Sequence, residues 1–370
     1  MIARPLGLVT VAAIALSLLL PIGMDGDARA FWPGQLTALI PALGALGALI
    51  ARLRIADDGW ADAAFGLAAL VIGAAPPLLL IDSGIALGFA AWGLWLYVIG
   101  LVLVAWQVME RLARLESSGR TLSLVVPALF GIWVIYLWQV IVIGFSIEPV
   151  LLPPPTRVAL KLVAQPDVLW GDFRQTFDAV LAGFAIGCAA GFATAVLIDR
   201  VPFLQRGLLP LGNLASAVPI VGVAPIMVMW FGFNWESKAA VIVVMIFFPM
   251  LINTRAGLVA ADHMQRDLMH SYGATYWQTF FKLRLPAALP FVFNALKINS
   301  TLALIGGIVA EFFGSPTAGL GFRISVEVGR MSVDVVWATI AVAALAGSLF
   351  YGVLALVERG LTFWHPSYRK

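Results

Sequence analysis

The sequence predicts an all-α integral membrane protein with about ten transmembrane helices. Of its 370 residues, 61% are hydrophobic and only 12% are charged, and the mean hydropathy is +0.96. A soluble domain carries about 25% charged residues. The apolar runs are long and continuous rather than alternating with a period of two, which favours helices over the strands of a membrane barrel.

A helix needs about 20 mostly apolar residues to cross a bilayer. Ten windows meet this requirement, at residues 5–22, 34–51, 62–82, 84–106, 122–145, 177–198, 207–232, 238–258, 290–312 and 336–358. Prolines interrupt the second and third windows, at Pro33, Pro41, Pro76 and Pro77. Membrane helices tolerate such breaks where neighbouring helices satisfy the freed carbonyl groups.

The first window has two interpretations. Residues 1–31 also carry the features of a secretory signal peptide, with Arg4, an apolar core and the small-residue pattern Ala28-Arg29-Ala30. The apolar run is longer than the ~7–15 residues usual in signal peptides, which favours a retained helix. Cleavage would leave the new end outside, so the topology of the remaining chain is the same in both cases.

The distribution of basic residues predicts the orientation. Lys and Arg are enriched in the cytoplasmic connections of membrane proteins. With the N-terminus inside, fifteen of the 23 Lys and Arg residues fall in inner segments and seven in outer ones, and Lys297 lies within a span. Both termini and the polar segment 259–290 are therefore expected in the cytoplasm.

The polar segment between the eighth and ninth windows predicts a helical hairpin. Met264, Leu268 and Tyr272 recur every four residues and line one face of a first helix. Gly273 follows, and glycine is the residue best suited to a sharp turn. The second helix combines an aromatic face with a basic one, formed by Trp277, Phe280 and Phe281 and by Gln278, Lys282 and Arg284. We expect Pro286 and Pro290 to end this helix and to begin the next span.

The spacing of this hairpin resembles the cytoplasmic EAA loop of permease subunits of ATP-binding-cassette (ABC) importers. That loop has an acidic-Ala-Ala triplet, three residues, Gly, nine residues, Ile, one residue and Leu-Pro. Here Asp267 begins the triplet, Gly273 follows six positions later, Leu283 replaces Ile, and Leu285 and Pro286 end the pattern. The spacing matches in full, although Leu and Met replace the two alanines.

The resemblance extends over about residues 120–365. The stretches EPVLLPPPTRVALKLV, LASAVPIVGVAPIMVMWFGF and AEFFGSPTAGLGFRI are similar to the nitrate, sulfonate and taurine branch of these permeases. This implies a multi-pass protein of the bacterial inner membrane, in which residues 116–370 form a six-helix permease domain. Residues 1–115, with about four helices, are then an accessory membrane region, separated by the polar linker 107–120.

The resemblance also implies partners and a coupling site. The partners are a cytoplasmic ATP-binding subunit, an extracytoplasmic substrate-binding protein, a second copy of the permease and membrane lipid. The loop would dock into a groove of the ATP-binding subunit through Asp267, Gly273, Trp277, Phe280, Phe281, Leu283, Leu285 and Pro286. The bulkier triplet leaves its packing against that groove open.

Other functional classes have weaker support in the sequence. A P-loop needs a lysine directly after a glycine, and none of the five lysines has one. The three histidines, His263, His270 and His365, fall outside the predicted spans, and Cys188 is the only cysteine. We therefore expect no ATPase motif, enzymatic site, metal, other cofactor or nucleic-acid partner. A membrane-embedded enzyme and a secondary transporter, which usually shows paired repeats, are the remaining alternatives, but neither an intramembrane cluster of catalytic groups nor a clear repeat is visible.

A solute route is expected where polar groups meet broken helices. The candidates are Ser216, Pro219 and Pro225 in the seventh window and Asn299, Ser300 and Thr301 in the ninth. The alternative is that these groups only bond neighbouring helices. Lys297 and Glu311 lie near opposite ends of the ninth window and are expected to reach the two interfaces by snorkelling.

The predicted cargo is a small organic solute. The candidate route has no Arg or Lys cluster of the kind that holds an anion through paired charge-assisted bonds. This favours a pyrimidine, a vitamin precursor or a flavin. A sulfonate, taurine or nitrate is the alternative, because a permease can pass an anion without binding it tightly.

Overall fold

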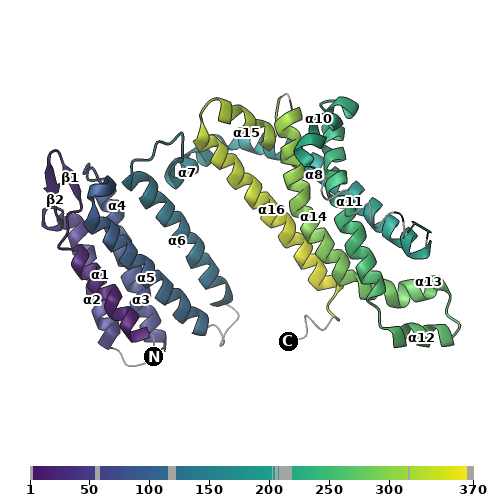
Figure 1. Ribbon diagram of the computed structural model, residues 1–370, viewed down its shortest axis with the longest axis horizontal. Helices are drawn as coiled ribbons and strands as arrows, with labels where there is room; N and C mark the ends of the chain where they lie inside the picture. The colour runs from purple at the N-terminus through teal and green to yellow at the C-terminus, as the bar shows by residue number, and fades with distance from the viewer. Residues whose placement is uncertain are drawn as a thin grey trace. The chain divides into compact units, whose positions relative to one another are not determined.

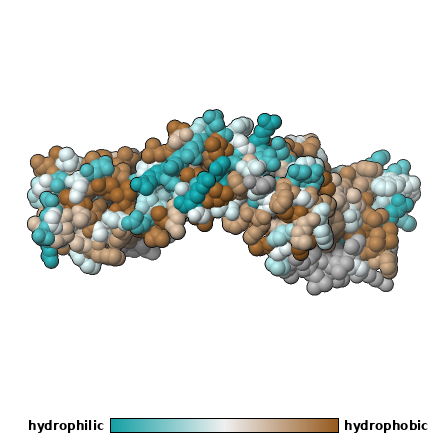
Figure 2. Space-filling view, turned by 90° about the horizontal axis from the view of Figure 1, so that it is seen from above, coloured by the Kyte–Doolittle hydropathy of each residue, from teal (hydrophilic) through white to brown (hydrophobic). Residues whose placement is uncertain are grey.

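The computed structural model describes residues 3–54, 59–115, 122–201, 203, 204, 207, 219–315 and 317–364. These residues are almost entirely helical, which confirms the predicted all-α class (Figure 1). The chain divides into two compact units, Met1–Val158 and Ala159–Lys370. Figure 2 shows extensive hydrophobic surface on each unit, as expected for faces that contact lipid.

The first unit is built around one long helix, α5. Its elements are α1 (Ala3–Ser17), β1 (Gly23–Asp25), β2 (Ala28–Ala30), η1 (Trp32–Gly34), α2 (Leu36–Arg54), α3 (Gly59–Gly73), α4 (Ala75–Ile81), η2 (Gly88–Ala90), α5 (Trp92–Leu115) and α6 (Leu122–Gly144). The buried residues of α5 recur at helical spacing, at Leu94, Tyr97, Leu101, Val104 and Val108. This period places them on one face, which the surrounding helices cover.

The segment after α1 folds into a short hairpin that the sequence did not predict. Strands β1 and β2 pair antiparallel, with Met24 opposite Arg29. Directly afterwards the indole of Trp32, which is fully buried, donates a 2.9 Å hydrogen bond to the carbonyl oxygen of Ser17. The pattern Ala28-Arg29-Ala30 is therefore strand β2 of a packed segment.

The second unit contains the remaining described helices, among them the longest ones. They are α7 (Pro155–Ala164), which crosses from the first unit, then α8 (Pro166–Arg200), α10 (Ile220–Phe231), α11 (Trp235–Val259), α12 (His263–Ser271), α13 (Tyr276–Thr279), the π-helical turn η4 (Phe280–Arg284), α14 (Leu285–Gly314), α15 (Leu320–Gly329) and α16 (Val333–Leu361). Helices α8, α11 and α14 form its core.

Glycines let α8 and α11 approach closely. Gly183, Gly187 and Gly191 recur every four residues on α8. A Cβ atom at Gly187 would lie 2.6 Å from Ile246, and one at Gly191 would lie 2.6 Å from the carbonyl oxygen of Phe247. Small residues at this spacing are typical of tightly packed membrane helices.

The ten predicted windows correspond to helices of unequal length. Among the described residues, eight segments are long and apolar enough to cross a membrane: Leu36–Arg54, Gly59–Ile81, Trp92–Leu115, Leu124–Gly144, Pro166–Arg200, Trp235–Val259, Tyr276–Gly314 and Val333–Leu361. The first and seventh windows hold shorter apolar helices, Leu6–Ser17 and Ile220–Phe231. The third window is broken at Ala74, because Pro76 and Pro77 begin the new helix α4.

The two compact units divide later in the chain than the predicted domains. Helix α6 packs on α4 and α5 and so belongs to the first unit. The predicted permease domain, which begins after residue 115, includes the same helix. That boundary concerns the family core rather than packing, and it stays a prediction.

Candidate functional site

A helical hairpin, α12 and α13, projects from one end of the second unit (Figure 1). Each helix has its own start signal. The carboxylate of Asp262 accepts a 2.7 Å hydrogen bond from the Met264 amide and caps α12, whereas Thr275 and Gln278 form a capping box at the start of α13. Gly273 turns the chain between them with φ +68, where side chains are disfavoured. Local chemistry therefore fixes the hairpin.

The second helix does not end at Pro286, and that expectation is wrong. Helix α13 continues through the π-helical turn η4 into α14, and the Leu285 amide bonds the carbonyl oxygen of Phe280. Pro286 and Pro290 both lie within α14. A π-helical turn is wider than an α-helical one, which relieves the clash that a proline ring makes with the preceding turn. Residues Tyr276–Gly314 consequently form one continuous helix of 39 residues.

The predicted coupling residues divide into exposed and buried groups. Asp267, Trp277 and Phe281 are exposed, and the rings of Trp277 and Phe281 stack with centroids 5.8 Å apart. Phe280 is only 3% exposed and packs with Leu258 and Ala288. Gly273 is exposed as well, and the other three, Leu283, Leu285 and Pro286, are half-buried. The aromatic face therefore has one ring that anchors the hairpin and two that are open to a partner.

An ion pair fixes the base of the hairpin. The guanidinium of Arg284 donates to both carboxylate oxygens of Asp199, at 2.6 and 2.7 Å, and its Nε donates to the carbonyl oxygen of Leu258 at 3.0 Å. The hydroxyl of Tyr276 donates to the same carboxylate at 3.0 Å. Since Asp199 ends α8 and Leu258 ends α11, one arginine joins three helices.

A second basic residue lies against the aromatic face. The guanidinium carbon of Arg200 lies 5.4 Å from the ring centre of Tyr276 and 5.7 Å from that of Trp277. A cation at this distance is attracted by the electron-rich ring faces. Arg284 was predicted on the basic face of the hairpin, and neither Asp199 nor Arg200 was predicted to contact it. Their adjacent charges directly after an apolar window were the available signal.

Five of the six predicted route residues lie in the described part of the chain, at α10 and in α14. Ser216 lies outside the described residues. Pro219 caps α10 and Pro225 lies within it, whereas Asn299 and Ser300 are fully buried in α14 and Thr301 is exposed.

The polar groups at positions 299–301 of α14 form hydrogen bonds within the protein. The Asn299 amide donates to the carbonyl oxygen of Ile246 at 3.1 Å and to the sulfur of Cys188 at 3.4 Å, and so links α14 to α11 and α8. The hydroxyl groups of Ser300 and Thr301 bond carbonyl oxygens of their own helix. The Asn299 contacts agree with the alternative that these groups bond neighbouring helices, whereas the two hydroxyl groups bond only within α14.

Lys297 and Glu311 do not snorkel as expected. The ammonium of Lys297 pairs with Glu358 of α16 at 2.6 Å, and the two side chains are 17% and 7% exposed. Glu311 is 1% exposed and accepts hydrogen bonds from the Thr176 hydroxyl at 2.7 Å and the Gly321 amide at 3.0 Å. Internal partners therefore bind the Lys297 ammonium and one carboxylate oxygen of Glu311, Oε2, which the sequence did not indicate.

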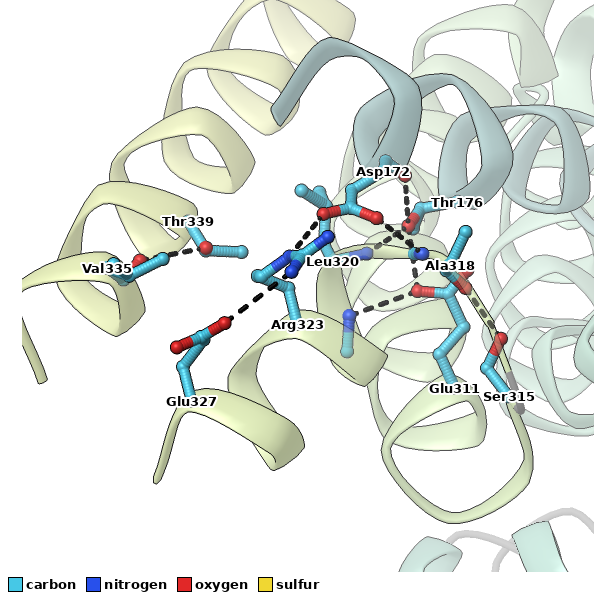
Figure 3. A network of polar contacts seen from close by, with 12 residues as sticks. Asp172, Thr176, Glu311, Ser315, Ala318, Leu320, Arg323, Glu327, Val335 and Thr339 are labelled. Atoms are coloured by element: carbon cyan, nitrogen blue, oxygen red, sulfur yellow. Dashed lines mark hydrogen bonds and ion pairs between the residues drawn. The ribbon is translucent and has the colours of Figure 1, made fainter. Parts of the chain in front are cut away.

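Glu311 belongs to a polar cluster at the end of the unit opposite the hairpin (Figure 3). Three consecutive amides at the start of α15 point at side chains of α8 and α14. Gly319 donates to Asp172 at 3.0 Å, Leu320 to the Thr176 hydroxyl at 2.8 Å, and Gly321 to Glu311. Carboxylates satisfy the free amides of a helix N-terminus and complement its dipole.

Two features make this cluster tight. Gly319 has φ +124, and a Cβ atom there would lie 2.4 Å from the Glu311 carboxyl group; one at Gly321 would lie 2.0 Å from the Ile308 carbonyl oxygen. Arg323 pairs with Asp172 at 2.7 Å. Burial opposes the charge of Arg323, but the hydrogen bond and the negative charge of Asp172 outweigh it and raise the pKa of the guanidinium. The arginine stays charged and locks α15 onto α8.

The chain is similar to permease subunits of known transport systems. Residues 183–363 match the family described as "Binding-protein-dependent transport system inner membrane component". The formylaminopyrimidine transport permease protein ThiX of Halalkalibacterium halodurans is 31% identical over 64% of this chain and 95% of its own length. The taurine transport system permease protein TauC of Escherichia coli K12 is 32% identical over 67% and 91%. The riboflavin transport system permease protein RibX of Chloroflexus aurantiacus is 28% identical over 62% and 86%.

Proposed function

The chain belongs to the inner-membrane permease subunits of binding-protein-dependent ABC importers, and from this premise we propose that the α12–α13 hairpin couples it to the ATP-binding subunit. The predicted importer role is confirmed, and the enzyme and secondary-transporter alternatives are set aside. The family lacks catalytic activity of its own, works with ATP-binding and substrate-binding partners, and is a multi-pass component of the inner membrane.

One observation carries the coupling proposal. The hairpin presents Asp267, Trp277 and Phe281 to solvent, while Arg284 binds its base to the ends of α8 and α11. Exposed aromatic rings on a rigid support suit a protein interface, because aromatic anchors supply much of the energy of such contacts. A movement of the hairpin would therefore be transmitted to α8 and α11 through the Arg284 side chain.

The coupling proposal is tested by co-purification of the ATP-binding subunit. Trp277→Glu and Phe281→Glu place charge on the open face and should reduce recovery at least tenfold. Val328→Glu, at an exposed apolar position of α15, is the matched control and should retain it. Full recovery with both hairpin variants would reject the hairpin as the docking site.

We further propose the orientation and the assembly. The excess of Lys and Arg in the inner connections supports a cytoplasmic hairpin and cytoplasmic termini. On α16, Leu345, Leu349 and Leu356 are 64 to 70% exposed and form an apolar stripe. We propose that a second copy of the chain covers part of this stripe in a homodimer and that lipid covers the rest. Residues 1–115 are proposed as an accessory region.

For the solute, we propose a neutral or aromatic heterocycle such as a pyrimidine, a vitamin precursor or a flavin. Lys297 is paired with Glu358, so it does not add a free cation to the candidate residues Pro219, Pro225 and Thr301 on the neighbouring helices α10 and α14. Relatives named for formylaminopyrimidine and riboflavin support this class, whereas the taurine relative supports a sulfonate as the alternative. Calorimetry of the cognate substrate-binding protein against both solute classes decides between them.

A further inference from the structure

A pocket of about 580 Å³ opens in the second unit at the end opposite the hairpin. Its walls come from α8, from the start of α11 and from the segment after α14. Asp178, in the α8 wall, precedes Asp199 by 21 residues, or about 32 Å of helix. Ser315, which lies beside Glu311 in Figure 3, lines the opposite wall and donates a 2.6 Å hydrogen bond to the Ala318 carbonyl oxygen.

The open charges of this pocket are acidic. Asp178 and Glu236 are exposed, and within the described part of the chain neither forms an ion pair. Lys238 also lines the pocket, but it is 1% exposed, and its ammonium donates to the carbonyl oxygens of Phe233 at 2.6 Å and Asn234 at 3.2 Å. The Lys238 ammonium is thus turned toward backbone carbonyl oxygens, and Glu236 and Glu311 attract it from nearby. Asp178 and Glu236 still present their exposed carboxylates to the pocket.

Aromatic side chains border the same opening. Phe233 and Trp235 line the pocket and are 59% and 47% exposed. Aromatic faces next to carboxylates suit a guanidinium or an ammonium group, which gains both cation–π and charge-assisted contacts. An anionic solute would instead meet two like charges.

We propose that this pocket receives an arginine or lysine side chain of the substrate-binding protein when that protein docks on the permease. The inference rests on the proposed function, which places the end opposite the hairpin outside the cytoplasm. The carboxylates of Asp178 and Glu236 favour a positively charged side chain. The partner is inferred from the position of the pocket at the outer end of α8, α11 and α14, where a substrate-binding protein would dock. A docked cation would lie beside the Glu311 cluster, at the far end of the helix that begins in the hairpin.

Photo-crosslinking in intact cells that express the full importer tests the proposal. p-Benzoylphenylalanine replaces Ala182, which lines the pocket, or Leu181, which is 43% exposed on α8 and outside its lining, as the matched control. We expect the 182 variant to crosslink to the substrate-binding protein within a few residues of an arginine or lysine, as located by mass spectrometry. The 181 variant should give at least tenfold less of this product.

Charge removal provides the second arm. Asp178→Asn combined with Glu236→Gln keeps the shape of the pocket and should reduce the crosslink at residue 182 at least tenfold. Asp167→Asn, on an exposed part of α8 outside the pocket, should leave it unchanged. A crosslink that is independent of both carboxylates, or one only to lipid, to a solute or to a second copy of this chain, would overturn the proposal.

A crosslinker at Leu268 of α12, in the same cells, distinguishes failure of the pocket proposal from failure of the coupling proposal. Capture of the ATP-binding subunit at residue 268 without capture of the binding protein at residue 182 rejects the pocket alone. Loss of capture at residue 268 counts against the coupling role of the hairpin itself.

Discussion

Arg284 and Asp199, which are 85 positions apart in the chain, form a bidentate ion pair with hydrogen bonds of 2.6 and 2.7 Å. The two side chains are 13% and 8% exposed. Parallel bonds of this kind fix orientation as well as distance. The direction in which the hairpin leaves the membrane helices is therefore set by one buried contact.

Breaking this pair from one side should destabilise the protein. Asp199→Leu leaves the Arg284 charge buried without its partner, which typically costs about 3 kcal/mol or more. The double variant Asp199→Leu/Arg284→Leu should recover part of this loss, since paired replacement by apolar groups is often nearly neutral. Thermal unfolding in detergent measures both. Glu110→Gln, which breaks an exposed pair with Arg114, is the control and should change stability by less than about 1 kcal/mol.

Gly273→Asp should leave the protein inserted but uncouple it. The substitution puts a side chain on a backbone with φ +68 and adds charge at the tip of the proposed interface. A Cβ atom there meets nothing within 4 Å, so the unit itself stays intact. Uptake and recovery of the ATP-binding subunit, measured together, should both fall at least tenfold. Normal uptake would contradict the role of this turn.

Two glycines of α15 should respond oppositely to alanine. Gly321→Ala forces a Cβ atom to 2.0 Å from a backbone oxygen and should cost about 1–3 kcal/mol or prevent folding. Gly329→Ala meets nothing within 4 Å and should be neutral or stabilising by up to about 1 kcal/mol. Melting temperatures in detergent compare the pair. Equal stability of the two variants would show that the cluster around Glu311 is looser than described.

A chain that begins near residue 119 should still insert and retain the ATP-binding subunit. The hairpin and the three residues that hold its base, Asp199, Leu258 and Arg284, all lie in the second unit. Their inner connections keep the basic bias that sets orientation. Membrane extraction followed by co-purification tests this, with the full-length chain as control. Loss of both properties would assign residues 1–115 to the core of the permease.

The hairpin could be predicted from local signals in the sequence. Contacts between residues far apart in the chain could not. Gly273 and the polar residues around it act within a few positions, so spacing alone located the turn. Asp172 meets Arg323 across 151 positions, and Lys297 meets Glu358 on another helix. Such pairs depend on how helices pack, which hydropathy does not encode. The same limit explains why Lys297 and Glu311 were expected at the interfaces.

Helix α13, the π-helical turn and α14 form one continuous helix that can act as a rigid lever. Glu311 follows Tyr276 by 35 positions, or about 52 Å of helix. Since no flexible connection interrupts it, tilting the hairpin end by roughly 5° displaces the other end by about 4–5 Å, the scale of one helical turn. The π-helical turn is the irregular joint within Tyr276–Gly314, and its stiffness sets how much of a hairpin movement would reach Glu311.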